Sequence, residues 1–343
     1  LAQGLLGLLV ASVAMLFAVW CFDRATVIHS GAMASGSPVE VASHFVSAMN
    51  DRTGQFTKAL MGLAAAGAVS AMGIRLGMGI LAWIVLPGVA ITLVGVLDFV
   101  VLTTDLRPVS AFLFSYDGSH WGVEAAKQAL LSAGVTLGAG LGVAMSLGAQ
   151  APQGLPWARS VIAVAMLDTA FLLVTAIIAS ALLFEVNVAP SEGLAAVFVA
   201  LPYAFVNVPM GEIYGTLFFF AMAAISWSAA LILMEPTVLL LEQEWGVGRL
   251  GGAILAATLA VLIVSMVLFA SDATLPQLSV LLGEWLLPVS LLLTALFVGW
   301  QMPRPILRGE LYREPQWLFR LWWWVIRWMT PPVCVLWLVS GVL

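Results

Sequence analysis

Four acidic residues stand inside segments that are otherwise apolar, and they are the first candidates for chemistry. They are Asp98 in VGVLDFVVL, Asp168 in VAMLDTAFLL, Glu235 in LILMEPTVLL and Glu284 in LLGEWLLPV. A carboxylate in an apolar helix is costly and commonly marks an ion or substrate pathway. Asp168 lies deepest and needs a partner or a cation. Asp98 and Glu284 lie nearer the outer parts of their segments, so a solvated role and a functional role stay open for them.

A run of small and hydroxylated residues, LLSAGVTLGAGLGV at 130–143, interrupts another apolar segment. Its glycines are Gly134, Gly138, Gly140 and Gly142. Each weakens a helix by about 1 kcal/mol relative to alanine. Close helix packing through small residues is one explanation. The spacing of the glycines draws no single face, however, and therefore favours local unwinding, with Ser132, Thr136 and freed carbonyls as ligands for a cation or a zwitterion.

The remaining polar groups carry weaker signals. Ser226 and Ser228, in AISWSAALILMEP, match the pattern of hydroxyls that bond back to their own helix. The histidines fall in expected loops or at helix ends without the spacing of metal ligands. Cys21 and Cys334 lie at opposite ends of the chain, which excludes a disulfide framework.

Composition identifies the class of protein in which these residues must be placed. The chain is 62% hydrophobic and 9% charged, with a mean hydropathy of +1.07, far from the charged content of soluble domains. Long apolar runs recur throughout, as in polytopic helical membrane proteins. A net charge of -5 with scattered arginines excludes a nucleic-acid-binding protein.

Hydropathy predicts one all-α transmembrane domain over residues 1–343, with about nine spans. The expected spans are 3–22, 56–73, 77–103, 122–147, 157–186, 214–241, 250–270, 274–300 and 320–342. Residues 187–213 are too apolar for an open loop yet are broken by proline and glycine, so we expect an extracellular helical hairpin there, with an ordinary transmembrane helix as the alternative. The span at 56–73 is rich in alanine and glycine and needs neighbours against which to pack.

Basic residues predict the orientation of these spans. With the first span running outward, the cytoplasmic loops contain eight arginines and the other side five basic residues. Short loops carry this bias consistently, which places the C-terminus outside. The segment WLFRLWWWVIRWM then puts several tryptophans beside Arg320 and Arg327 at the cytoplasmic edge, as an interfacial belt does.

Residues 193–245 are similar to the neurotransmitter:sodium symporter family. GLAAVFVALPYAFVNVPMGEIYG and the helix that follows, with LLLEQEW, resemble the family's fourth extracellular loop and eighth helix. RSVIAVAMLDTAFLL resembles the seventh helix, LLPVSLLLTALFVGW the tenth, and PQWLFRLWWWVIRWMTPP the approach to the eleventh. The resemblance implies helices three to eleven of an inverted-repeat, five-plus-five helix transporter fold, incomplete at the N-terminus because helices one and two are missing.

The resemblance also implies roles for individual residues. Gln128 matches a residue near the extracellular gate. Sodium would be held by Ser132, Asp168, the carbonyl of Ile225 and Ser228. Substrate would lie against Leu131, Gly134, Thr136 and Leu137, in the unwound part of the family's sixth helix. Ala229 departs from the pattern because it replaces a hydroxyl residue of the second sodium site. Ala14 departs because it stands where a tyrosine usually meets the substrate carboxylate.

The resulting prediction is a sodium-coupled symporter of an amino acid or small amine, working by alternating access. We expect no enzymatic activity and no organic cofactor. The expected location is a plasma membrane, as a multi-pass protein of a bacterial inner membrane. The departures keep open a divergent relative that is proton-coupled or does not transport. An aspartyl intramembrane protease using Asp98 and Asp168 is a third alternative, but the chain lacks its glycine-x-glycine-aspartate motif.

Overall fold

The computed structural model describes residues 2–33, 37–115, 122–151, 154–189, 193–270 and 274–340. The chain is about 86% helical, and no β-strand occurs among these residues. Six helical segments are long and apolar enough to cross a membrane. They are Ala2–His29, Ile74–Thr103, Trp157–Glu185, Gly211–Glu244, Arg249–Phe269 and Thr274–Gln301. Helix also covers most of each of the nine ranges expected from hydropathy; which of them cross a membrane stays a prediction.

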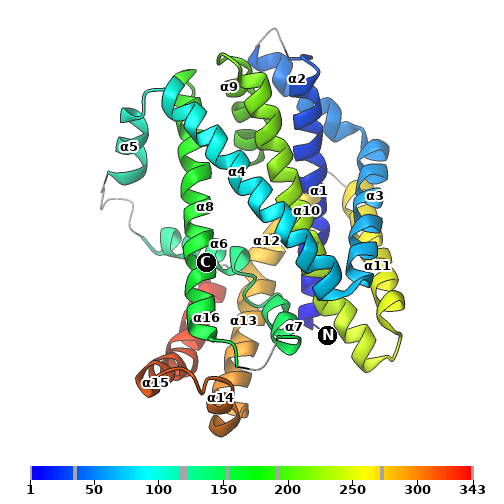
Figure 1. The fold of residues 1–343 in the computed structure, drawn as a ribbon, viewed down its shortest axis with the longest axis vertical. Helices are drawn as coiled ribbons and strands as arrows, with labels where there is room; N and C mark the ends of the chain where they lie inside the picture. The colour runs from blue at the N-terminus through cyan, green and yellow to red at the C-terminus, as the bar shows by residue number, and fades with distance from the viewer. Residues whose placement is uncertain are drawn as a thin grey trace.

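The first half of the chain forms long helices, such as α1, α4 and α8, and short ones, such as α5 and α7 (Figure 1). Its helices are α1 (Ala2–His29), α2 (Pro38–Asn50), α3 (Arg52–Ala71), the π-helical segment η1 (Ile74–Met78), α4 (Gly79–Thr103), α5 (Arg107–Phe114), α6 (Val123–Thr136), α7 (Val143–Ala149) and α8 (Trp157–Glu185).

The second half contains four more π-helical segments, designated η. Its helices are η3 (Ala196–Ala200), α9 (Leu201–Val206), α10 (Gly211–Glu244), α11 (Arg249–Phe269), α12 (Thr274–Val280), η4 (Leu281–Leu286), α13 (Leu287–Leu296), η5 (Phe297–Gln301), α14 (Arg304–Glu310), α15 (Gln316–Trp324), η6 (Val325–Met329) and α16 (Thr330–Ser340). In Figure 1, α2 and α9 lie at the upper end of the bundle, and α14 and α15 at the lower end.

Helices α1 and α10 form the centre of the bundle and pack against each other more extensively than any other pair of described helices. Two glycines of α1 permit this approach. The Thr237 hydroxyl donates to the Gly4 carbonyl at 2.8 Å. A Cβ atom added at Gly7 would lie only 2.7 Å from the Leu233 carbonyl oxygen. Small residues therefore bring the two backbones together, as they do at many membrane helix interfaces.

The alanine- and glycine-rich helix α3 has the neighbour that its composition requires. It packs along α11, where a Cβ atom added at Gly67 would lie 3.1 Å from the Cβ atom of Ala257. Ala66 and Ala253, on the same two helices, are completely buried. The weak apolar character of this segment is therefore compensated by close contact between small side chains.

Helix α1 is longer than the sequence predicts, because it continues through Asp23 and Arg24 to His29. Both charged groups have partners inside the fold. The Asp23 carboxylate pairs with the Lys58 ammonium at 2.6 Å. Arg24 is only 1% exposed and donates to the His44 carbonyl at 3.2 Å. The hydropathy pattern predicts that the span ends before Asp23, the first charged residue. In the fold the helix continues, because Asp23 and Arg24 are paired with groups on neighbouring helices.

The expected hairpin at 187–213 is seen in part, since residues 190–192 lie outside the described ranges. The described residues form one short helix, η3 with α9, and a turn at Met210 with φ of +59° leads into α10. Phe198 in this helix is fully buried and its ring contacts Trp20 of α1 and Phe45 of α2. The helix therefore covers one end of α1, and its position outside the membrane stays a prediction.

Candidate functional site

The glycine-rich run forms a break in a helix, as the sequence predicts. Helix α6 ends at Thr136 and α7 begins at Val143. Three glycines between them, Gly138, Gly140 and Gly142, have φ values of +63°, +76° and +77°. Only glycine adopts this backbone region readily. The alternation of glycines is therefore what keeps the two short helices apart.

The break starts later than expected. Ser132, Gly134 and Thr136 lie within α6, and of the residues expected in unwound backbone only Leu137 lies there. Gly134 does not unwind the helix, because a single glycine costs it only about 1 kcal/mol. A Cβ atom at Gly134 would also lie 3.1 Å from the Leu287 side chain, so the missing side chain serves packing.

Three helices hold the break in place. The Ser290 hydroxyl of α13 donates to the Gly140 carbonyl at 2.6 Å. A Cβ atom added at Gly142 would lie 3.2 Å from Pro236 of α10 and 3.3 Å from Gln3 of α1. The unwound backbone thus packs closely against α1, α10 and α13. A side chain at Gly140 or Gly142 would collide with these helices.

Three carbonyl groups of the break have no hydrogen-bond donor. The carbonyls of Leu137, Ala139 and Leu141 accept no hydrogen bond from any described residue. The Leu141 oxygen is directed toward α1, because a Cβ atom at Gly7 would lie 3.2 Å from it. The C-terminal end of α6 adds a partial negative charge at the same place. Free carbonyls beside a helix end are suited to binding a cation.

The expected substrate-lining residues face two directions. Leu131 and Gly134 pack toward η4 and α13: a Cβ atom added at Gly283 of η4 would lie 3.3 Å from the Leu131 side chain. Thr136 and Leu137 are exposed, as are Ser132 and the expected gate residue Gln128. Their roles in binding remain predictions.

The expected sodium ligands are spread over three helices: Ser132 on α6, Asp168 on α8, and Ile225 with Ser228 on α10. Asp168, Ile225 and Ser228 are each half-buried. The Ser228 hydroxyl donates to the Ala224 carbonyl at 2.8 Å, the local bond that its pattern predicts. That bond leaves the hydroxyl oxygen able to accept or to coordinate. The Ser132 and Asp168 side chains, both described, form no hydrogen bond with each other.

Glu235 has a partner that the sequence reasoning did not identify. Its carboxylate is 0% exposed, pairs with Arg249 of α11 at 2.5 Å and accepts from the Ser70 hydroxyl at 3.0 Å. Arg249 also donates to the Ser70 carbonyl at 2.9 Å and lies 3.6 Å from Glu242. This network joins α3, α10 and α11. A buried charge is stable when it is paired and hydrogen-bonded in this way.

The other two membrane acids differ from each other. Glu284 of η4 pairs with Lys127 of α6 at 2.6 Å, and the two side chains are 26% and 10% exposed. The first half of the broken helix is therefore tied to η4 by charge as well as by packing. Asp98 lies on the exposed surface of α4, close to the end of that helix.

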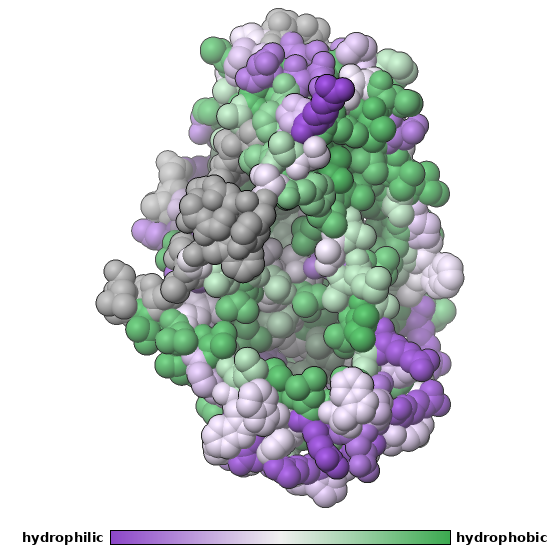
Figure 2. Space-filling model, turned by 90° about the vertical axis from the view of Figure 1, so that its left-hand side faces the viewer, coloured by the Kyte–Doolittle hydropathy of each residue, from purple (hydrophilic) through white to green (hydrophobic). Residues whose placement is uncertain are grey.

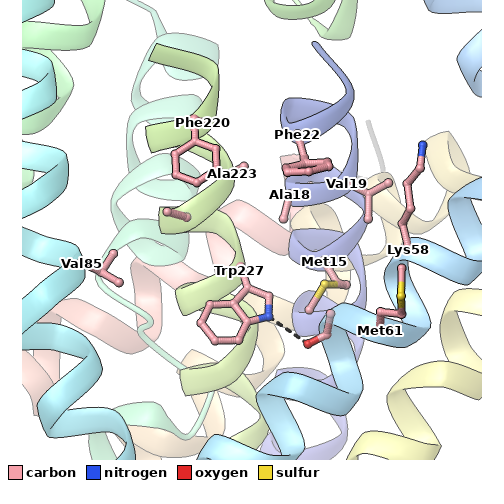
Figure 3. A pocket seen from close by; sticks show the side chains of 12 residues that line it. Met15, Ala18, Val19, Phe22, Lys58, Met61, Val85, Phe220, Ala223 and Trp227 are labelled. Carbon is pink, nitrogen blue, oxygen red and sulfur yellow. Dashed lines mark hydrogen bonds between the residues drawn. The ribbon is translucent and has the colours of Figure 1, made fainter. Parts of the chain in front are cut away.

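A cavity of about 420 Å³ lies between α1, α3, α4 and α10. Figure 3 shows Met15, Phe22, Met61 and Trp227 around it, with the Trp227 indole donating to the Gly62 carbonyl at 2.8 Å. None of the expected substrate or sodium residues lines this cavity.

A second cavity, of about 590 Å³, lies beside the helix break. It is lined by α1, by α13 and by Met145 of α7. Its polar groups include Ser290, which bonds the break, and Thr294, which accepts from the Gln3 amide at 2.7 Å. The expected substrate residues do not line it either. Apolar walls with a few hydrogen-bonding groups are typical of small-molecule sites.

Neither models of protein families nor the sequences of characterised proteins match this chain. Among solved structures, the crystal structure of MhsT in complex with L-phenylalanine is similar, with a TM-score of 0.87 and 22% sequence identity. The alignment covers 99% of this chain and 80% of the MhsT chain. The chain therefore has the fold of MhsT, a bacterial transporter of the neurotransmitter:sodium symporter family. The fold resemblance expected from the motifs is confirmed.

Proposed function

We propose that this multi-pass membrane protein is a secondary transporter that couples sodium to uptake of an amino acid or related small amine by alternating access. The observation that carries the proposal is the break between α6 and α7, where three glycines have positive φ and the carbonyls of Leu137, Ala139 and Leu141 accept no hydrogen bond from described residues. Transporters commonly build their ion and substrate sites at such discontinuous helices. The fold shared with MhsT supports this class over an intramembrane protease.

We propose Ser132, Asp168, Ile225 and Ser228 as the sodium ligands. Each supplies a hydroxyl, a carboxylate or a carbonyl oxygen, the donors that hard cations prefer. The Asp168 side chain has no hydrogen bond or ion pair with another described residue, so its charge is available to a cation.

We propose Leu131, Gly134, Thr136 and Leu137 as the substrate-facing residues and Gln128 as part of the gate. MhsT was crystallised with L-phenylalanine, and the leucines at these positions suit an apolar side chain. L-phenylalanine is therefore the first substrate to test. We further place the protein in a bacterial inner membrane with its C-terminus outside.

The alternative is a carrier of the same fold that does not use sodium. Ala229 favours it, because that position offers no hydroxyl to a sodium ion. Asp168 would then be the proton-carrying group, because ionisable residues inside apolar helices commonly form proton pathways.

The test is uptake of radiolabelled L-phenylalanine, and of a mixture of amino acids, into proteoliposomes that contain the purified protein. Sodium is compared with choline outside, at several external pH values. We expect uptake that requires sodium and shows a sodium affinity about tenfold or more weaker in the Asp168→Asn variant. Asp98→Asn is the matched control, because Asp98 is exposed on α4.

Uptake that ignores sodium but follows the pH gradient would replace the sodium mechanism by the proton-coupled alternative. Absence of uptake for every amino acid, with protein that elutes as a single folded species, would refute transport of this substrate class. Equal effects of the two aspartate substitutions would remove Asp168 from the proposed site.

A further inference from the structure

Aromatic and basic side chains gather where η5, α14, α15 and η6 meet, at the lower end of the bundle. We name the tryptophan–arginine cluster for its members, which are Trp300, Arg304, Trp323, Arg327 and Trp328. The guanidinium carbon of Arg304 lies 3.6 Å from the ring centre of Trp323. That of Arg327 lies 4.7 Å from the same ring, 4.5 Å from Trp300 and 5.8 Å from Trp328. Two cations therefore share one indole.

Close backbone approach builds this cluster. A Cβ atom added at Gly299 of η5 would lie 3.2 Å from the Cα atom of Arg327 in η6. Both segments are π-helical, and such turns frequently occur at functional sites. The cluster is thus a consequence of tight packing between two helices and not of flexible side chains meeting at a surface.

The cluster contains donors with no acceptor. The Arg327 Nε and Trp323 Nε1 atoms are buried and have no hydrogen-bond partner. Neither the Arg304 nor the Arg327 guanidinium forms an ion pair or a hydrogen bond with a described residue. Leaving buried donors unbonded costs about 1–3 kcal/mol for each group. An acceptor that carries negative charge would satisfy them all.

The surrounding charge has the sign that attracts such an acceptor. Residues 303–328 contain five arginines and two glutamates, in a chain whose net charge is -5. Figure 2 shows hydrophilic and near-neutral side chains gathered at the lower end of the molecule, beneath a surface that is largely hydrophobic. A basic, tryptophan-rich rim next to an apolar band matches the headgroup level of a bilayer.

We propose that the tryptophan–arginine cluster binds the phosphate of an anionic phospholipid headgroup. Arg304 and Arg327 bind the phosphate oxygens, since planar guanidinium groups match phosphate geometry and form charge-assisted hydrogen bonds. The Trp323 indole N–H donates to the same group. The acyl chains lie along the exposed apolar side chains of Phe297 and Leu293 on the neighbouring helices.

The test is native mass spectrometry of the full-length protein in nonionic detergent, titrated with phosphatidylglycerol or with phosphatidylcholine. We expect phosphatidylglycerol to bind about tenfold more tightly. Arg304→Gln should weaken it about tenfold or more, because Arg304 is exposed and its loss removes a direct contact without opening a cavity. Arg320→Gln is the matched control: Arg320 is an exposed arginine of α15 outside the cluster, and we expect a change of about fivefold at most.

Arg327→Gln is the second variant, with thermal unfolding measured alongside to separate loss of binding from loss of fold. Equal weakening by Arg304→Gln and Arg320→Gln would overturn the proposal, because it would indicate diffuse attraction to the whole basic rim. Millimolar inorganic phosphate is the competitor that distinguishes the source. Displacement of the lipid by inorganic phosphate at that concentration would identify a site for a soluble anion and would also overturn the lipid assignment.

Discussion

The buried ion pair between Glu235 and Arg249 supports a prediction whose size follows from the structure. Replacing Arg249 with methionine keeps most of the side-chain volume but leaves the Glu235 carboxylate, 0% exposed, without a counter-ion. It also removes the bond to the Ser70 carbonyl. Breaking a buried pair by removing one partner costs about 3–5 kcal/mol. We therefore expect Arg249→Met to lower the free energy of unfolding by that amount.

The complementary substitution should be milder. Glu235→Gln keeps an acceptor for the Ser70 hydroxyl, and Arg249 retains Glu242 at 3.6 Å as its counter-ion. We expect a loss of about 1–2 kcal/mol for this variant. In the double variant Glu235→Gln with Arg249→Met no charge is buried unpaired. The double variant should therefore be more stable than the sum of the single losses predicts, by about 2 kcal/mol or more.

Unfolding by sodium dodecyl sulfate in mixed micelles, followed by tryptophan fluorescence, measures these free energies. Arg320→Met is the control, since Arg320 is exposed and its substitution should change stability by about 0.5 kcal/mol or less. Strictly additive losses in the double variant would refute the reasoning, because they would show that Glu235 and Arg249 contribute independently. A loss in Arg249→Met no larger than in the control would do the same.

Three further predictions concern the helix break and its contacts, and the same unfolding assay measures each. Gly7→Ala should lower the free energy of unfolding by about 1–3 kcal/mol, because its Cβ atom would lie 2.7 Å from the Leu233 carbonyl oxygen. Gly88→Ala is the control: a Cβ atom there has no atom within 4 Å, so this substitution should be neutral or stabilising by up to about 1 kcal/mol. Ser290→Ala should lower the free energy of unfolding by about 0.5–1.5 kcal/mol, because it removes the hydrogen bond to the Gly140 carbonyl. The protein stays folded at this loss, so we expect a reduced uptake rate in folded protein. Gly140→Ala should cost about 1–2 kcal/mol because alanine resists a φ of +76°; an unchanged midpoint would contradict the broken geometry.

Elements whose signal is local were predictable from the sequence. Glycine-rich backbone at 134–142 predicts a break, because the conformational preference of glycine is a property of each residue alone. Apolar runs predict helix for the same reason, and helix covers most of each of the nine expected ranges. The start of the break at Leu137 was not predictable. It depends on which glycines take positive φ, and packing against Ser290, Pro236 and Gln3 decides that.

Partners of charged residues were not predictable, because each comes from a distant part of the chain. In the sequence, Lys127 and Arg249 are interpreted as loop or interfacial charges that determine the orientation of the spans in the membrane. The fold brings Lys127 to Glu284 on η4, and it turns Arg249 inward to Glu235. Hydropathy patterns hold no information on such pairings. The tryptophan–arginine cluster is similar: an interfacial belt is predictable from composition, but the two arginines on one indole are not.

The pairing of these charges strengthens the case for Asp168. Of the four membrane acids singled out in the sequence, Glu235 and Glu284 have basic partners, and Asp98 is exposed on α4. Their charges are accounted for by structure or by exposure. Asp168 is half-buried and forms no ion pair or hydrogen bond with a described residue. A carboxylate kept in an apolar helix without such a partner is explained most simply by a bound cation, sodium or a proton, as the proposed function requires.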